Sequence, residues 1–303
     1  MKKIYLTFDI ETIVSGISKD SNYLTGVYLA SMFIAEEMRK RQLKGTFFIS
    51  LSSKQNEIDQ SIYLEFIKWL LHSLKSYENI KIEPHLHALN LPVSFETKYD
   101  EFNKYDLNKQ KELLVYAKDF FQSQNIHVNS FRPGGFSVNE FYYDSLFESG
   151  YKNSSILQKE EKPTINLVTG EIEKNNVYQT KNGIKEYPVT SIKIRSIKGK
   201  EELVNLSPDF FKLSTVENYI NKLDYININF HSFSIYQNRL IRETHDNQFY
   251  KSLKFILLES PLKRFLKLTS IQTLNTNTVF ANELLCWLDY IEQNSFETYF
   301  IGD

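Results

Sequence analysis

The chain has 303 residues, of which 42% are hydrophobic, so it can bury a sizeable core and is not of a disordered composition. Lys and Arg number 36 and Asp and Glu 37, and the resulting net charge of −1 argues against electrostatic capture of nucleic acid or of an acidic membrane. The single cysteine, Cys286, excludes an intrachain disulfide, and the apolar run at residues 284–288 predicts that it lies on a buried helix face.

Short β-rich runs alternate along the chain with longer runs of helical spacing. The predicted strands lie at residues 3–8, 45–50, 79–87, 127–132, 184–189, 225–230 and 265–271. The predicted helices lie at residues 23–42, 59–74, 107–124, 139–150, 215–222, 247–258 and 275–293. This alternation indicates an α/β fold with parallel strands and helical crossovers. A polar stretch at about residues 156–183 breaks the pattern, and we expect it to be an insertion in a single domain that spans residues 1–303.

The N-terminus is Met1-Lys2-Lys3, and its two lysines resemble the start of a signal peptide. The apolar run at residues 4–8 is too short for such a peptide, and Asp9 and Glu11 interrupt it. No window of the sequence is long and apolar enough to span a membrane. We therefore expect a cytoplasmic protein without an integral membrane segment.

Polar side chains follow the first and third predicted strands directly. In the motif TFDIE (residues 7–11), Asp9 and Glu11 can point to the same side, because side chains alternate along a strand. In the motif EPHLH (residues 83–87), His85 and His87 have the same spacing, which commonly aims two imidazoles at one metal ion. Two histidines and a carboxylate together predict a site for a divalent metal.

Two later strands also end in polar motifs. In FRPGG (residues 131–135), Arg132 precedes a Pro-Gly-Gly run in which the backbone can approach a ligand closely. In NFHSF (residues 229–233), His231 ends a strongly alternating strand. Because active sites of β/α barrels lie at the C-terminal ends of strands, these motifs together predict metal-assisted hydrolysis with acid and base groups.

The order of these motifs resembles the polysaccharide deacetylase family (NodB homology, carbohydrate esterase family 4). That family has a TFDD motif, an ATFF-like second strand, a metal-binding histidine motif, an RxPxG-like loop and a late strand that ends in His. This chain has TFDIE, GTFF, EPHLH, FRPGG and NFHSF in the same order, and the resemblance spans roughly residues 4–271. It implies a distorted (β/α) barrel of about seven strands, the NodB-homology fold.

The chain departs from the family pattern in two places. The family has adjacent aspartates, whereas here Ile10 separates Asp9 from Glu11. The family's histidines are four residues apart, whereas His85 and His87 are two apart. These changes resemble a divergent branch that is associated with surface-polysaccharide gene clusters. They leave open whether Asp9 or Glu11 is the base.

The resemblance implies a role for each of these side chains. The ligands of a divalent metal, expected to be Zn²⁺, would be Glu11, His85 and His87. The catalytic residues would be the general base Asp9, its orienting partner Arg132, and His231, which would protonate the leaving amine. The substrate-binding residues would be Pro133, Gly134 and Gly135.

The resemblance therefore implies a carbohydrate N-deacetylase of surface-polysaccharide biosynthesis, which removes an N-acyl group, expected to be N-acetyl. The expected substrate is an acylated sugar in a nucleotide-linked or lipid-linked glycan. Two alternatives stay open: another metal-dependent amidase or deformylase on the same barrel, and a catalytically inactive glycan-binding protein. Amidohydrolase and PHP-type phosphoesterase barrels usually place His-x-His at the first strand, whereas Asp-x-Glu comes first here.

Overall fold

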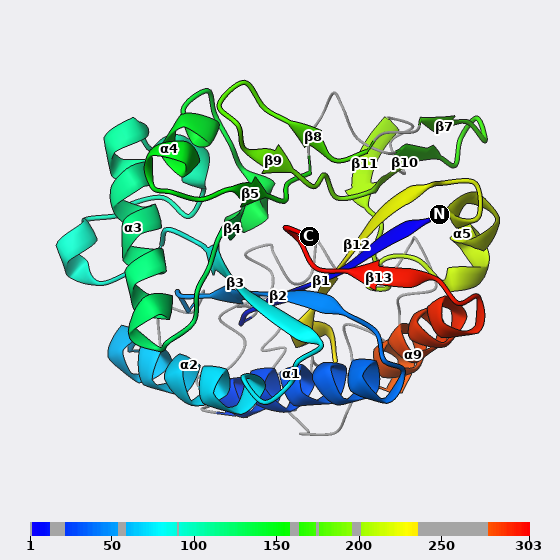
Figure 1. The fold of residues 1–303 in the computed structure, drawn as a ribbon, viewed down its shortest axis with the longest axis horizontal. Helices are drawn as coiled ribbons and strands as arrows, with labels where there is room; N and C mark the ends of the chain where they lie inside the picture. The colour runs from blue at the N-terminus through cyan, green and yellow to red at the C-terminus, as the bar shows by residue number, and fades with distance from the viewer. Residues whose placement is uncertain are drawn as a thin grey trace, which may run out of the picture.

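The computed structural model describes residues 2–12, 22–53, 59–89, 91–157, 164–173, 176–195, 201–235 and 278–303. This part of the chain forms a curled nine-stranded main sheet and a second sheet of four strands, with helices packed outside them (Figure 1). The predicted helix at residues 247–258 and the predicted strand at residues 265–271 lie outside the described residues.

The main sheet has the order β12-β1-β2-β3-β4-β5-β9-β8, with β13 beside β1. Its strands are β1 (Lys3–Ile10), β2 (Gly45–Ser50), β3 (Ile80–Leu86), β4 (Ser130–Pro133), β5 (Asn153–Ser154), β8 (Tyr178–Gln179), β9 (Lys185–Glu186), β12 (Tyr225–His231) and β13 (Glu297–Tyr299). Along this order the strands from β12 to β9 pair in parallel, as the alternating pattern predicted for an α/β fold.

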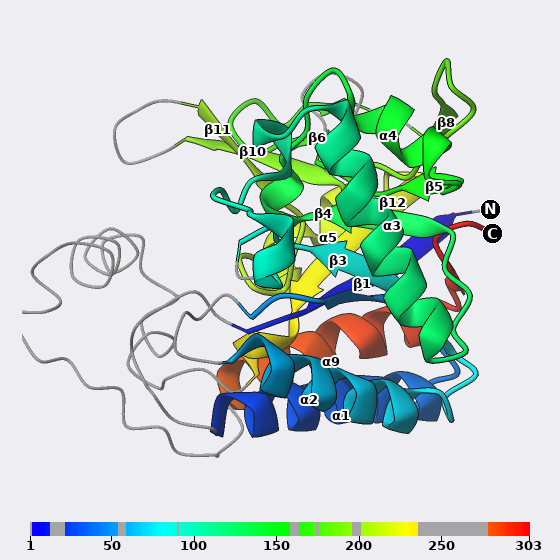
Figure 2. The same cartoon turned by 90° about the vertical axis from the view of Figure 1, so that its left-hand side faces the viewer.

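The helices lie on the outside of the main sheet, as Figures 1 and 2 show. They are α1 (Asn22–Lys40), α2 (Gln60–Leu74), α3 (Leu107–Ser123), α4 (Tyr142–Glu148), α5 (Leu213–Ile220) and α9 (Thr278–Gln293). Short 3-10 turns are η1 (Val93–Phe95), η2 (Phe102–Lys104), η3 (Gly134–Phe136) and η4 (Ser232–Ser234). Two of the predicted helix starts have capping carboxylates, because Asp59 accepts from the backbone N–H of Ser61 and Asp106 accepts from that of Lys109.

The inner and outer faces of the central strands differ in polarity. On β1, Phe8 packs against Phe47 in the apolar core beneath the helices. The neighbouring residue, Thr7, lies on the opposite face and accepts a hydrogen bond from Arg132. On β12, Asn227 joins the same polar interior through its hydrogen bond with Thr7. The alternation of these strands therefore places their polar residues inside the curled sheet and close to one another.

The last strand, β13, was not predicted from the sequence. It pairs with β1 at Lys3–Tyr5, whereas β2 pairs with β1 only from Thr7 onward, so β13 fills the edge that β2 leaves open. Just beyond it, Ile301 is fully buried in a cluster with Tyr5, Phe48, Tyr187 and Tyr225. The first and last strands are thus neighbours, and Figure 2 shows both chain ends on the same side.

The second sheet extends beyond the predicted insertion. Its order is β11-β10-β6-β7, built from β6 (Thr164–Asn166), β7 (Ile172–Glu173), β10 (Ser191–Arg195) and β11 (Glu201–Asn205). The predicted strand at residues 184–189 contributes only the two residues of β9 to the main sheet, and the chain then leaves it again for β10 and β11.

The predicted burial of Cys286 is wrong, because this residue is exposed. The apolar face of α9 contains Leu284, Leu288 and Ile291, which recur at helical spacing. Two residues after Leu284, the helix has turned by about 200°, so Cys286 faces away from the core. Among the described helices, none combines the length and the apolar character that a membrane span requires.

Candidate active site

The C-terminal ends of the central strands bring the predicted site residues together. The strand register pairs Asp9 with His231 and His85 with Arg132. In Figure 2 the arrow of β1 points away from the two chain ends, and this end of the sheet holds the site. The six predicted catalytic and ligand residues that lie here are Asp9, Glu11, His85, His87, Arg132 and His231.

Glu11, His85 and His87 form a compact set of donor atoms. One atom of each side chain lies within 4.8 Å of the others. Glu11 Oε2 is 3.2 Å from His85 Nε2 and 3.0 Å from His87 Nε2, and all three residues are buried. Two ligands of a tetrahedral zinc ion stand about 3.3 Å apart, so the spacing of these atoms suits a shared metal.

The hydrogen bonds of the two imidazoles support the same conclusion. His85 Nδ1 is 3.0 Å from the backbone carbonyl of Arg132, and His87 Nδ1 is 2.8 Å from Asp100 Oδ2. Because these oxygens accept, each Nδ1 carries the proton, and in a neutral imidazole Nε2 then presents a lone pair. Two lone pairs that face a carboxylate oxygen at close range require a cation or a proton between them, so the donor set fits a divalent metal.

Arg132 is fully buried and uses all five of its N–H groups. Its Nη1 donates to Asp9 Oδ1 (2.6 Å) and to Asn229 Oδ1 (2.8 Å). Its Nη2 donates to Thr7 Oγ1 (2.9 Å) and to Ser155 Oγ (2.8 Å), and its Nε donates to the backbone carbonyl of Ser155 (3.2 Å). The guanidinium is therefore held in one orientation, with Asp9 as its anionic partner.

Asp9 lies between Arg132 and His231. Its Oδ2 accepts a hydrogen bond from Asn229 Nδ2 (3.2 Å) and lies 3.7 Å from His231 Nε2. Burial alone would raise the pKa of this carboxyl, but the charge of Arg132 and the charges of nearby imidazoles outweigh burial, so its pKa lies below the ordinary value. Asp9 is thus held ionised inside the barrel, next to the metal-ligand set.

His231 is oriented by an aspartate that sequence reasoning missed. His231 Nδ1 donates to Asp209 Oδ2 (2.8 Å), and the same oxygen accepts from the His231 backbone N–H (3.0 Å). His231 Nε2 consequently points toward Asp9 and toward Glu11 Oε1, which is 3.9 Å away. Burial alone would lower the pKa of His231, but Asp209, together with Asp9 and Glu11, raises it overall. Asp209 lies alone in a loop of the sequence, with no neighbouring motif to identify it.

The Pro-Gly-Gly loop lies against His87. A Cβ at Gly134 would be 2.5 Å from His87 Nδ1, so only glycine allows this approach. Gly135 has a φ of 58°, and among the described residues no atom lies within 4 Å of the position a Cβ would take. Pro133 ends β4 directly before the two glycines. The backbone at Gly135 is therefore open on the side where a side chain would stand.

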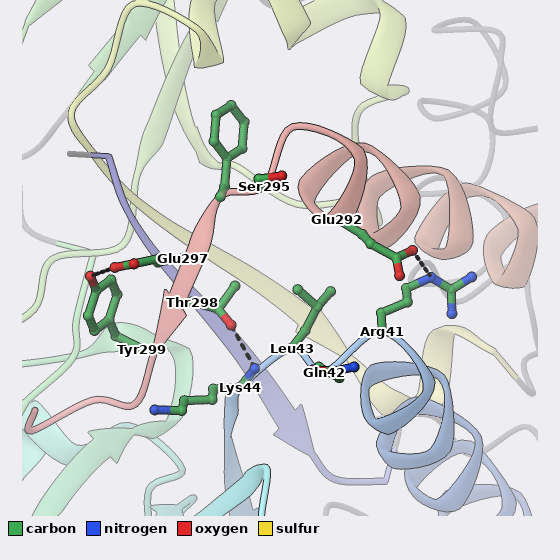
Figure 3. Close-up of a pocket in the computed structure, with 10 residues that line it drawn as sticks. Arg41, Gln42, Leu43, Lys44, Glu292, Ser295, Glu297, Thr298 and Tyr299 are labelled. Carbon is green, nitrogen blue, oxygen red and sulfur yellow. Dashed lines mark hydrogen bonds and ion pairs between the residues drawn. The ribbon is translucent and has the colours of Figure 1, made fainter.

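A groove of about 480 Å³ lies at the opposite end of the main sheet (Figure 3). Its walls are the segment before β2 and the strand β13. Figure 3 shows Arg41 directed at Glu292, with Nε and Oε2 3.9 Å apart, and the backbone N–H of Lys44 donating to Thr298 Oγ1 (2.6 Å). This groove contains none of the six predicted catalytic and ligand residues.

Comparisons with known proteins gave structural matches only. No protein-family model matches the chain, and no curated protein matches it significantly. A solved structure described as a polysaccharide deacetylase from Mycobacterium smegmatis has a TM-score of 0.45 and 12% identity, over 88% of this chain and 89% of that one.

Two further solved structures are similar to the chain. A protein from Bordetella bronchiseptica, described as a polysaccharide deacetylase involved in O-antigen biosynthesis, has a TM-score of 0.43 and 10% identity over 94% of this chain and 90% of that one. A family 4 carbohydrate esterase from Streptomyces lividans has a TM-score of 0.42 and 10% identity over 84% of this chain and 88% of that one. Two of these three structures are thus described as polysaccharide deacetylases and one as a family 4 carbohydrate esterase.

Proposed function

We propose that this protein is a metal-dependent carbohydrate N-deacetylase. The observation that carries the proposal is one cluster in which Glu11, His85 and His87 converge, with Asp9 and His231 beside them. Zinc is the proposed metal, because two imidazoles and one carboxylate with room for a further ligand are typical of catalytic zinc sites. Such an ion, when bound, lowers the pKa of water toward ~7 and polarises the acyl carbonyl.

Asp9 and His231 supply the proton transfers of the proposed reaction. Asp9 Oδ1 accepts a hydrogen bond from Arg132, so Oδ2 is the oxygen that accepts a proton from the attacking water. Asp209 holds His231 through Nδ1, so Nε2 is the atom that gives a proton to the leaving amine nitrogen. The charges around His231 favour its protonated form and those around Asp9 favour its ionised form, which suits an acid and a base.

The proposed substrate is an N-acetylated amino sugar in a nucleotide-linked or lipid-linked glycan of surface-polysaccharide biosynthesis. The open space beside Gly135 supports a substrate-binding role for the loop of Pro133, Gly134 and Gly135, because a ligand can reach the backbone there. Backbone N–H groups at such a position can stabilise the charge that develops on the acyl oxygen.

The test is metal content together with release of acetate. We expect about one Zn²⁺ per chain in the wild type, since the described part of the chain contains one donor set of three ligands. His85→Ala removes one of these ligands, so the metal is lost. His72→Ala, at an exposed position on α2, is the matched control and retains the metal. The substrates are N-acetylated amino sugars in free, nucleotide-linked and oligomeric form.

The catalytic assignments have their own variants. Asp9→Asn and His231→Ala are expected to keep the metal and to lose about 10²- to 10⁴-fold in acetate release, the usual contribution of an acid or base. A wild-type protein that takes up no divalent metal would contradict the proposal. A protein that binds metal and sugars but releases no acetate would instead be a glycan-binding protein.

A further inference from the structure

Asp100 makes a contact with a metal ligand that the proposed mechanism does not use. Its Oδ2 is 2.8 Å from His87 Nδ1, on the side of the imidazole that faces away from Glu11. The corresponding atom of the other ligand, His85 Nδ1, is met by a backbone carbonyl, that of Arg132. The two histidines are thus oriented in different ways, and only the partner of His87 is a side chain.

The position of Asp100 is fixed by its own loop. The backbone carbonyl of Asp100 accepts a hydrogen bond from the N–H of Ala88, the residue that follows His87 (3.2 Å). On one side of Asp100, the hydroxyl of Tyr105 donates to the carbonyl of Tyr99 (2.7 Å) and accepts from the Tyr99 N–H (2.9 Å). These bonds fix the backbone on both sides of the Asp100 side chain independently of the imidazole.

The other side of the loop is tied to the Pro-Gly-Gly segment. Phe102 is fully buried and packs against Phe131, with ring centroids 5.5 Å apart. Its backbone N–H donates to Ser137 Oγ (2.9 Å), just beyond η3. The loop therefore connects two parts of the candidate site, the ligand His87 and the segment that contains Gly134.

We propose that Asp100 is a positioning residue for the metal ligand His87. Its carboxylate accepts the Nδ1 proton, which fixes the tautomer and the ring orientation and directs the Nε2 lone pair toward Glu11 and the metal. The negative charge also makes Nε2 a stronger donor to a cation. The inference rests on the proposed metal site, but the contact between His87 Nδ1 and Asp100 does not involve the metal and is testable without it.

The first measurement concerns zinc affinity. The dissociation constant for Zn²⁺ is measured by competition with a chromophoric chelator in the wild type, Asp100→Ala, Asp100→Asn and Glu101→Ala. We expect about a 10- to 100-fold weaker affinity in Asp100→Ala, the usual cost of losing such a partner. Asp100→Asn recovers part of it, since an amide oxygen still accepts from Nδ1. Glu101, exposed and next in sequence, is the matched control, and Glu101→Ala binds as the wild type does.

The second measurement is made on the apo protein. Imidazole ¹H–¹⁵N spectra are expected to show His87 protonated at Nδ1 in the wild type and to lose this preference in Asp100→Ala, while the apo melting temperature stays unchanged. Equal zinc affinity in Asp100→Ala and wild type overturns the inference, and so does an unaltered His87 spectrum. If the wild type binds no zinc at all, the proposed function is refuted; the role of Asp100 toward His87 then stands if Asp100→Ala still loses the Nδ1 preference and falls if it does not.

Discussion

Arg132 is a buried charge whose every N–H group has an acceptor, and one of those acceptors is the proposed base. Arg132→Lys keeps the charge but provides one nitrogen where the guanidinium has three, so Asp9 and Ser155 cannot both be reached. We expect a loss of about 1–3 kcal/mol in the free energy of unfolding for each buried acceptor that is left without a donor, measured by urea denaturation. Acetate release falls with it.

The control for this substitution is Arg39→Lys. The Arg39 side chain is 60% exposed and pairs with Glu36 on the surface of α1, so we expect a change within about 0.5 kcal/mol. An Arg132→Lys variant as stable as the wild type would contradict the contribution of this buried network to stability.

Glu186 is a second buried charge, located between the sheet and α4. Its carboxyl accepts from the backbone N–H of Ile156 (2.9 Å) and from the hydroxyl of Tyr143 (3.2 Å), and burial raises its pKa to about 7. Between about pH 4.5 and pH 7 the folded protein binds this proton more tightly than the unfolded chain does. Stability therefore falls as pH rises through this window, by about 3 kcal/mol in total.

Glu186→Gln removes that titration and keeps the polar contacts. We expect the variant to exceed the wild type in stability at pH 8 and to lose this advantage toward pH 5, in urea denaturation at both values. The exposed Glu78→Gln is the control and shows no such dependence. An advantage of Glu186→Gln that is equal at pH 5 and pH 8 would show that burial does not raise the pKa of this carboxyl.

The sequence identified six candidate site residues that lie together in the structure, but not Asp100 and Asp209, which contact two of them. Asp9, Glu11, His85 and His87 are recognisable because each pair repeats at strand spacing after an apolar run. Asp100 and Asp209 lie in loops, and only the folded chain brings them to their histidines. Their roles therefore depend on tertiary contacts that no local pattern encodes.

At the scale of elements, the loop after β4 contains two adjacent glycines with different requirements. Gly134→Ala places a methyl group 2.5 Å from the imidazole of His87, so the ring must move and we expect weaker zinc binding. Gly135→Ala meets no described atom and costs only the strain of its positive φ, about 1 kcal/mol in stability. Zinc titration and thermal unfolding of both variants check this contrast. Equal zinc affinity in the two variants would contradict the close packing of Gly134 on the ligand.

The elements that the sequence predicted well are those with a long periodic pattern. The strand β2 and the start of α3 agree with prediction, because an apolar run and a capping aspartate mark them. The two-residue strand β5 and the three-residue β13 were missed, because such lengths show no period. Inside the main sheet β5 pairs with both β4 and β9, whereas β13 pairs with β1, and each pairing depends on neighbours that are remote in sequence.

For the whole molecule, the alternation of strands and helices was enough to predict a parallel sheet. A helix between two strands brings the chain back to the edge where the first strand began, so the second strand runs in the same direction as the first. The same alternation did not predict the second sheet. Its β10 and β11 form an antiparallel hairpin, β10 also pairs with β6, and polar composition marked only the part before residue 184. A hairpin of this kind buries too little apolar surface to leave a clear pattern.

The proposed metal ties together strands that are separated in the sheet by β2, because Glu11 follows β1 and His85 belongs to β3. An ion that binds only the folded chain stabilises all of it, by about 2.7 kcal/mol at a free concentration of 100 times the dissociation constant. For a chain of this size we expect the melting temperature to rise by about 5 °C with Zn²⁺ and to fall when a chelator removes it. Glu11→Gln should abolish the shift, and the exposed His72→Ala should keep it. Thermal unfolding with and without Zn²⁺ measures this. An equal rise in Glu11→Gln and wild type would place the stabilising ion somewhere other than between these two strands.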